Sequence, residues 1–299
     1  MPLFRRGDLS LHYLTRGQGE PVLLVHGLGS SGADWAFQAP ALEARFRLIA
    51  PDLRGSGHSR ADTDDYSVEG FAADLWALLD SLGVMRPNIV GFSLGGAVAL
   101  EMALQRPDDV PRLVLINSLP SYRIDHWRKW AEARLQSALV RMIGMRRAAR
   151  IVARRIFPEP AQRSMRERAA RVVGGVPKRS YLASARALEK WCALARLDRL
   201  RARTLVLAAE FDYTPLAEKR AFAMRIGAEF VVVLGSRHGT PFDAIGATNE
   251  SLLRFLSDAA PTPTAAARRD PPEAVPAAAP AGGLADEHAR SAPAVTPGS

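Results

Sequence analysis

A Gly-Phe-Ser-Leu-Gly turn at Gly91–Gly95 constrains this chain more than any other feature of its sequence. It stands between a short apolar run, Asn88–Val90, and a longer run, Leu94–Leu104, that is apolar on nearly every side. The first pattern predicts a buried strand and the second a buried helix. Glycines on both sides of Ser93 let strand and helix approach closely while the hydroxyl projects outward. The turn therefore predicts an exposed nucleophile at the carboxyl end of a strand.

Other apolar runs, bounded by turn residues, predict an α/β protein with a parallel sheet. Strands that are apolar throughout and alternate with helices are typical of a sheet covered on both faces. A crossover helix is predicted at 67–82, with Ser67 as its N-cap and Gly83 after its end. The predicted strands are Leu9–Leu14, Pro21–Val25, Arg47–Ala50, Asn88–Val90, Arg112–Ile116, Thr204–Ala208 and Phe230–Leu234.

Composition divides the 299 residues into a core, an insertion and a tail. The core comprises 1–118 and 203–258, and a chain of this length buries one sizeable core. The insertion at 119–202 is predicted to be a helical cap, because it holds several helix patterns and no convincing strand. The tail at 259–299 is mostly Ala, Pro, Gly and Ser, so we expect it to be disordered.

Cysteine content and the N-terminus favour a cytoplasmic protein. Cys192 is the single cysteine, so no intrachain disulfide forms, and we expect it to be a packed thiol. The N-terminal segment has no apolar stretch typical of a secretory signal, and no later run is long enough to span a bilayer.

Two polar residues follow other predicted strands. Asp212 comes after the sixth strand and His238 after the seventh. Because the carboxyl ends of parallel strands gather at one edge, Ser93, Asp212 and His238 are expected to converge. A serine nucleophile needs a base, and the base needs a group that fixes its tautomer. We predict His238 as the base and Asp212 as the orienting acid, with Glu210 as the competing carboxylate.

An attacked carbonyl oxygen becomes negatively charged and needs preorganised N–H donors. The His-Gly-Leu-Gly loop at 26–29 follows a predicted strand, and Leu94 follows the nucleophile. The backbone amides of Leu28 and Leu94 are therefore the predicted oxyanion hole. His26 is expected to hold the loop by hydrogen bonds, and His58 is assigned no catalytic role.

In this order along the chain, these pieces resemble the α/β-hydrolase fold-1 family over about Leu9–Leu256. The pieces are His26-Gly27, the stretch Asp52–Ser59, the turn Gly91–Gly95, Asp212 and His238. The resemblance implies a mostly parallel sheet of about eight strands, a helical cap after the sixth, and acyl-enzyme chemistry without a metal or organic cofactor. Arg237 departs from the glycine that many relatives have before the histidine.

Within that family, serine at position 93 argues against dehalogenases and epoxide hydrolases, which place Asp there. We predict a serine hydrolase that cleaves an ester or thioester of an apolar acyl substrate. Three alternatives stay open: an acyltransferase, a carbon–carbon bond hydrolase and a non-catalytic ligand receptor on the same fold. The carbon–carbon reaction is disfavoured because the loop at 27–32 lacks the proline-containing pattern typical of hydrolases of ring-cleavage products.

Positive charge is concentrated in the insertion. Between Leu119 and Arg203 there are 22 Lys and Arg against 6 Asp and Glu, while the net charge of the whole chain is +9. In one interpretation the apolar cap face, with Trp127 and Trp130, closes over the substrate and the arginines are solvated. In the other, the basic face docks an acidic acyl carrier, a coenzyme A thioester or an anionic membrane surface. Nucleic acid is not a predicted partner, because no recognised module accompanies the charge.

Overall fold

A nine-stranded sheet forms the centre of the computed structural model, which describes residues 2–61, 65–124, 134–135, 138 and 140–258. Its order is β1-β2-β4-β3-β6-β7-β8-β9, with β5 paired to β2 beside this path. Neighbours from β4 to β9 are parallel, whereas β2 pairs antiparallel with β1, β4 and β5. The strands are β1 (Leu3–Arg6), β2 (Leu9–Arg16), β3 (Glu20–Val25), β4 (Phe46–Pro51), β5 (Arg60–Ala61), β6 (Asn88–Phe92), β7 (Arg112–Ile116), β8 (Arg203–Ala209) and β9 (Glu229–Val233).

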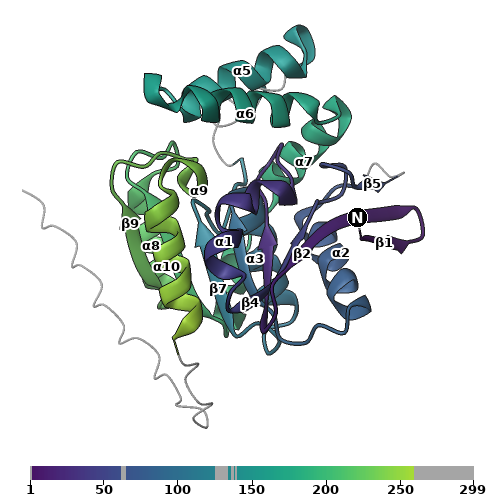
Figure 1. The fold of residues 1–299 in the computed structure, drawn as a ribbon, viewed down its shortest axis with the longest axis vertical. Coiled ribbons are helices and arrows are strands. Elements are labelled where there is room, and N and C mark those ends of the chain that lie inside the picture. The colour runs from purple at the N-terminus through teal and green to yellow at the C-terminus, as the bar shows by residue number, and fades with distance from the viewer. Residues whose placement is uncertain (1, 62–64, 125–133, 136–137, 139, 259–299) are drawn as a thin grey trace, which may run out of the picture. The chain divides into compact units, whose positions relative to one another are not determined.

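Helices cover both faces of this sheet (Figure 1). One face carries α2 (Val68–Ser81), α3 (Leu94–Gln105) and α8 (Leu216–Ile226), and the other carries α1 (Ala39–Leu42) and α10 (Ile245–Ser257). The Ser67 hydroxyl accepts a 3.0 Å hydrogen bond from the Gly70 amide and so caps α2 as predicted. The predicted fold, a mostly parallel sheet of about eight strands with helices on both faces, is confirmed.

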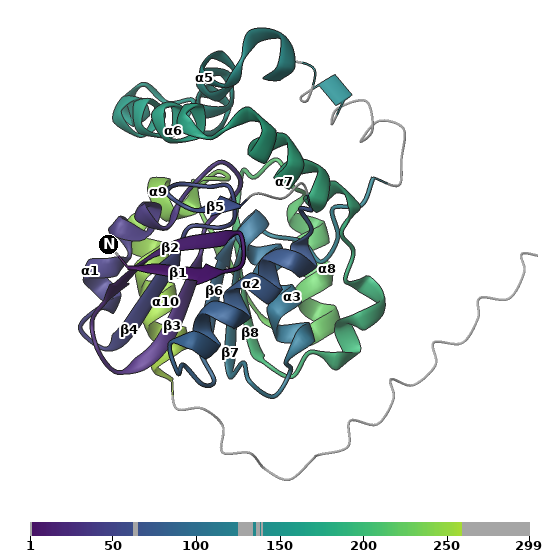
Figure 2. The same cartoon turned by 90° about the vertical axis from the view of Figure 1, so that its right-hand side faces the viewer.

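The cap helices lie between β7 and β8 in the chain. They are α5 (Met145–Ile156), α6 (Arg163–Gly175) and α7 (Lys178–Lys190), with short 3₁₀ turns η2 (Pro160–Gln162) and η3 (Leu194–Arg199). Figures 1 and 2 show α5 and α6 side by side, farther from the sheet than α7. Among the described cap residues the sole β contact is an isolated bridge between Ser121 and Cys192.

Two close approaches fix the cap over the edge of the sheet that carries Ser93. A Cβ added at Gly239 would lie 2.8 Å from the Phe157 ring, and one added at Gly29 would lie 3.1 Å from the Tyr181 ring. Both glycines belong to core loops that follow strands, and both aromatic rings belong to the cap. The predicted tail at 259–299 lies outside the described residues. Within the described part, no helix has the length and apolar character needed to cross a membrane.

Candidate active site

The backbone at Ser93 is held in an unusual conformation between β6 and α3. Its φ of 53° and ψ of −116° lie in a region that side-chain-bearing residues rarely adopt. A Cβ at Gly91 would lie 2.2 Å from the Gly95 carbonyl oxygen, and a Cβ at Gly95 would lie 2.1 Å from the Val25 carbonyl oxygen. Only glycine fits at either place, which explains the motif around the serine.

Three side chains predicted from the sequence meet at this edge. The Ser93 Oγ lies 3.0 Å from the His238 Nε2, and the His238 Nδ1 lies 2.8 Å from the Asp212 Oδ1. Glu210, the competing carboxylate, instead accepts a 2.8 Å hydrogen bond from the Gly235 amide. The structure therefore brings Asp212 to the imidazole and leaves Glu210 at the surface.

The second oxygen of Asp212 has partners that sequence reasoning missed. The Thr214 hydroxyl donates to Oδ2 at 2.7 Å, and the Lys219 ammonium, which is fully buried, contacts the same oxygen. Burial alone would raise the pKa of Asp212, but the hydrogen bond and charge of His238, together with Lys219, hold it well below its ordinary value. Burial lowers the pKa of Lys219, and the Asp212 charge opposes this in part. The carboxylate is thus ionised and shared between two cation-forming groups.

Tyr213 also reaches the imidazole. Its hydroxyl lies 2.9 Å from the His238 Nε2, and the two ring centroids are 4.2 Å apart. The Nε2 atom therefore has two hydroxyl neighbours, Ser93 and Tyr213. Tyr213 and Thr214 directly follow the predicted acid, so their place in the chain was a usable signal. Lys219 gave no such signal, because lysine is rarely fully buried.

Asn117, just after β7, fixes the segment that carries the histidine. Its side-chain amide donates to the His238 carbonyl oxygen at 2.8 Å, and its Oδ1 accepts from the Ala209 amide at 2.7 Å. One buried side chain thereby ties the ends of β7 and β8 to the His238 loop. This network gives the imidazole a fixed position.

The loop after β3 is held by His26. Its Nδ1 donates to the Gly27 carbonyl oxygen at 2.8 Å, and its Nε2 accepts from the Leu53 amide at 2.9 Å. Burial lowers the pKa of His26, so the ring is neutral and can fill both roles. Leu28 in this loop packs against the apolar cluster of the cap. Leu94 is the first residue of α3, so its N–H has no acceptor within that helix.

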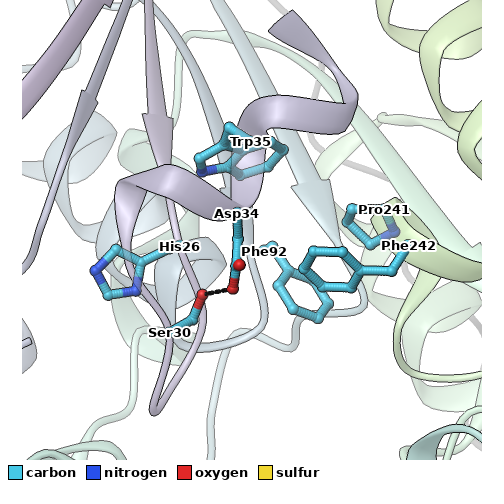
Figure 3. A pocket seen from close by; sticks show the side chains of 7 residues that line it. All are labelled: His26, Ser30, Asp34, Trp35, Phe92, Pro241 and Phe242. Atoms are coloured by element: carbon cyan, nitrogen blue, oxygen red, sulfur yellow. Dashed lines mark hydrogen bonds between the residues drawn. The ribbon is translucent and has the colours of Figure 1, made fainter. Parts of the chain in front are cut away.

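A small cavity lies behind this loop, and Figure 3 shows the side chains around it. Its volume of about 10 Å³ is no more than one water molecule needs, so it is a packing gap and not a substrate site. Asp34, beside it, accepts from the Ser30 hydroxyl and pairs with Arg168 of α6 at 3.2 Å. The lining residues are His26, Ser30, Asp34, Trp35, Phe92, Pro241 and Phe242.

One group of described residues has metal-ligand chemistry. Ligand atoms of His12, Asp52 and His58 all lie within 4.8 Å of one another. However, the Asp52 Oδ2 already accepts from the His12 Nδ1 at 3.0 Å and from the His58 amide at 2.8 Å. The cluster therefore fastens the segment after β4 to β2, and we assign it no metal. The predicted substrate contacts Trp127 and Trp130 lie outside the described residues.

The sheet order, the strained serine turn and the cap define an α/β protein of the hydrolase type. The family model for the alpha/beta hydrolase fold matches residues 20–150. A protein of Caulobacter segnis named as a carbamate hydrolase, RutD, is 34% identical over 251 residues, which cover 80% of this chain and 92% of that protein. The chain therefore belongs to the α/β-hydrolase fold family and is a hydrolase.

Solved structures show the same likeness. The enol-lactonase of Burkholderia xenovorans LB400 has a TM-score of 0.79 at 25% identity, covering 86% of this chain and 100% of that one. A thermophilic esterase from Thermogutta terrifontis has a TM-score of 0.74 at 27% identity, covering 83% of this chain and 93% of that one. Both similar proteins are hydrolases by name.

Proposed function

We propose that this hydrolase cleaves an ester or thioester through an acyl-enzyme intermediate. The observation that carries the proposal is the pair of hydrogen bonds in series, 3.0 Å from Ser93 to His238 and 2.8 Å from His238 to Asp212. Ser93 Oγ attacks the carbonyl carbon while the His238 Nε2 takes its proton. That proton then passes to the leaving alcohol or thiol as its bond to the acyl carbon breaks. Water, activated by the same imidazole, releases the acid.

Two further sets of groups stabilise the charges that develop during the reaction. The amides of Leu28 and Leu94 donate to the developing oxyanion, and the α3 N-terminus adds its positive dipole end there. Asp212, kept ionised, holds the imidazole in the required tautomer and stabilises its cationic form. These roles need no metal ion.

An apolar acyl group suits the surroundings of the loop. Leu28 touches an apolar cap cluster that includes Tyr181 and Val173. An acyl chain that packs against this cluster would be removed from water. Trp127 and Trp130 remain candidates for substrate contact on sequence grounds alone. Carbamates and enol-lactones, which the similar proteins are named for, also present a carbonyl bound to a heteroatom, so both belong in a substrate screen.

A fluorophosphonate probe tests the nucleophile directly. We expect it to label Ser93 in the wild type and to leave the Ser93→Ala variant unlabelled, with hydrolysis of aryl esters lost in parallel. Folded wild-type protein that takes up no label would contradict the proposal. A ligand-induced change without turnover of any ester would then favour a receptor.

The same assay separates the remaining reactions. A panel of aryl esters of increasing chain length, run with and without alcohol acceptors, distinguishes hydrolysis from acyl transfer. Product esters formed in preference to the free acid would reassign the chain as an acyltransferase. Cleavage of a vinylogous diketone, with esters left intact, would reassign it to carbon–carbon bond hydrolysis.

A further inference from the structure

The outward side of α5 carries five cationic side chains. Arg146, Arg147, Arg150, Arg154 and Arg155 are exposed, and their spacing places them on one side of the helix. The helix contains no acidic residue. Ile151 is the one large apolar side chain on this surface, which we call the α5 face.

The arginines of the α5 face differ from several others nearby. In the described part of the chain none of the five has an ion-pair partner, whereas Arg163 pairs with Glu167 and Arg168 with Asp34. The inward side of α5 is apolar and buried, through Ala148, Ala149 and Ala153. The helix is therefore anchored by its alanines and presents uncompensated charge to solvent.

One end of the α5 face reaches the candidate active site. The Arg155 guanidinium lies 5.6 Å from the centre of the Tyr213 ring, and the Tyr213 hydroxyl lies 2.9 Å from the His238 Nε2. Phe157, just after the helix, packs on Gly239 beside the histidine. A partner resting on the α5 face would thus hold an attached acyl group close to Ser93.

We propose that the α5 face docks an acidic protein that carries the acyl substrate as a thioester; this rests on the proposed acyl-enzyme function. Charge complementarity is the argument for an anionic partner. A helix that lies in a bilayer turns its large apolar side chains to the lipid, but α5 turns its apolar side inward. The face therefore fits a folded acidic surface better than a membrane.

This docking would raise the rate at which enzyme and carrier associate and would not change the rate of the chemical steps. Charges on the α5 face attract an acidic protein over about 8 Å at physiological ionic strength, and added salt shortens that range. They do not touch the reacting carbonyl, so kcat for a small ester should not depend on them. The dependence should appear in kcat/KM for the carrier-bound substrate.

Two substrates with the same acyl chain separate docking from chemistry. The probes are a bacterial acyl carrier protein loaded with an octanoyl thioester and p-nitrophenyl octanoate. Raising NaCl from about 50 to about 500 mM should lower kcat/KM for the carrier substrate at least about tenfold, and for the small ester less than about twofold. Equal salt responses would overturn the proposal.

A charge-matched control tests the location of the effect. The test variant replaces Arg146, Arg147, Arg150 and Arg154 by Gln, and leaves Arg155 because it contacts Tyr213. The control replaces four exposed arginines outside the α5 face, Arg5, Arg6, Arg86 and Arg199, by Gln. Only the test variant should lose about tenfold in kcat/KM for the octanoyl carrier. Equal losses in both variants would make the effect one of net charge and overturn the proposal.

Binding without turnover keeps docking distinct from catalysis. Ser93→Ala should bind the octanoyl carrier protein with a salt-dependent affinity that the four α5 replacements abolish. If that binding occurs while no ester is ever hydrolysed, docking stands and the proposed function fails. The Ser93→Ala variant could instead bind phosphatidylglycerol vesicles through the same arginines and fail to bind the carrier protein. That result would overturn the proposal and identify a membrane as the partner.

Discussion

Cationic side chains in two regions of this molecule have opposite surroundings. Lys219 is fully buried at the edge of the sheet, where it contacts the carboxylate that holds His238. The arginines of the α5 face are exposed and have no acidic partner among the described residues. A buried charge depends on its partner, whereas an exposed one is free to meet another molecule. The first region should respond sharply to single changes, and the second to salt and to partners.

The largest expected effect is the loss of Asp212. Asp212→Asn removes the group that fixes the imidazole, and kcat should fall by roughly 10⁴-fold if the triad behaves like that of the serine proteases. It also leaves Lys219 without an anionic partner, which should lower the free energy of unfolding by about 3–5 kcal/mol. Steady-state kinetics and urea unfolding measure the two losses separately.

A second change separates those losses. Adding Lys219→Met to Asp212→Asn removes the unpaired buried charge, so stability should recover while kcat stays low. Glu210→Gln is the matched control and should change kcat little, because Glu210 contacts the Gly235 amide and not the imidazole. A larger loss from Glu210→Gln than from Asp212→Asn would show that the acid is assigned wrongly.

Acid pH should next reveal the Asp212 pair through stability. The folded-state pKa of Asp212 lies below its ordinary value of 3.8, so its stabilisation is complete above that value and is lost as pH falls toward the folded one. The free energy of unfolding of the wild type should therefore exceed that of the double variant by a constant amount from neutral pH to about pH 5. Below about pH 4 it should shrink by up to about 1.4 kcal/mol per pH unit. A difference that does not change with pH would contradict the pairing.

Lys219→Met alone should have a smaller effect on rate. Without the ammonium, the full charge of Asp212 favours the protonated imidazole, and a protonated imidazole is not a base. In the pH profile of kcat/KM, the acid limb should move to higher pH by up to about one unit. The plateau value of kcat should fall less than about tenfold. A merely structural lysine would lower the plateau and leave the limb in place.

The smallest effect belongs to the α5 face. Replacing Arg146, Arg147, Arg150 and Arg154 by Gln should change the free energy of unfolding by less than about 0.5 kcal/mol for each site. Turnover of p-nitrophenyl octanoate should stay within about twofold of wild type, because none of these four side chains touches the reacting atoms. Thermal unfolding and initial rates measure both. A marked loss of stability would mean that these arginines are part of the packed cap.

The sequence was most informative where strands are buried on both faces. β6 and β7 are buried along their whole length and are apolar after their first residues, Asn88 and Arg112, so their patterns predicted them. The ends of β6, β8 and β9 predicted where the polar side chains would meet. β1 and β5 were missed. β1 is short and mostly exposed, and it is a strand because it pairs with β2 and not because of its own pattern.

The contacts around the site were less predictable. The sequence of α8 does not indicate that the Lys219 side chain points inward. Its burial depends on the Asp212 carboxylate, which belongs to the loop after β8 and not to α8. The Tyr213 hydroxyl likewise reaches the Nε2 atom through the fold of the loop after β8. Pairings of this kind join side chains whose spacing follows no helix or strand period, so periodicity cannot find them.

The contact between Phe157 and Gly239 limits how far this scaffold can be rearranged. A Cβ at Gly239, next to His238, would lie only 2.8 Å from the Phe157 ring. A chimera that exchanges the cap as a unit would therefore leave a void beside His238 unless the new cap supplies an aromatic ring there. A chimera should therefore be joined after position 157 and not at the boundary between cap and core. The Phe157 ring then stays with His238.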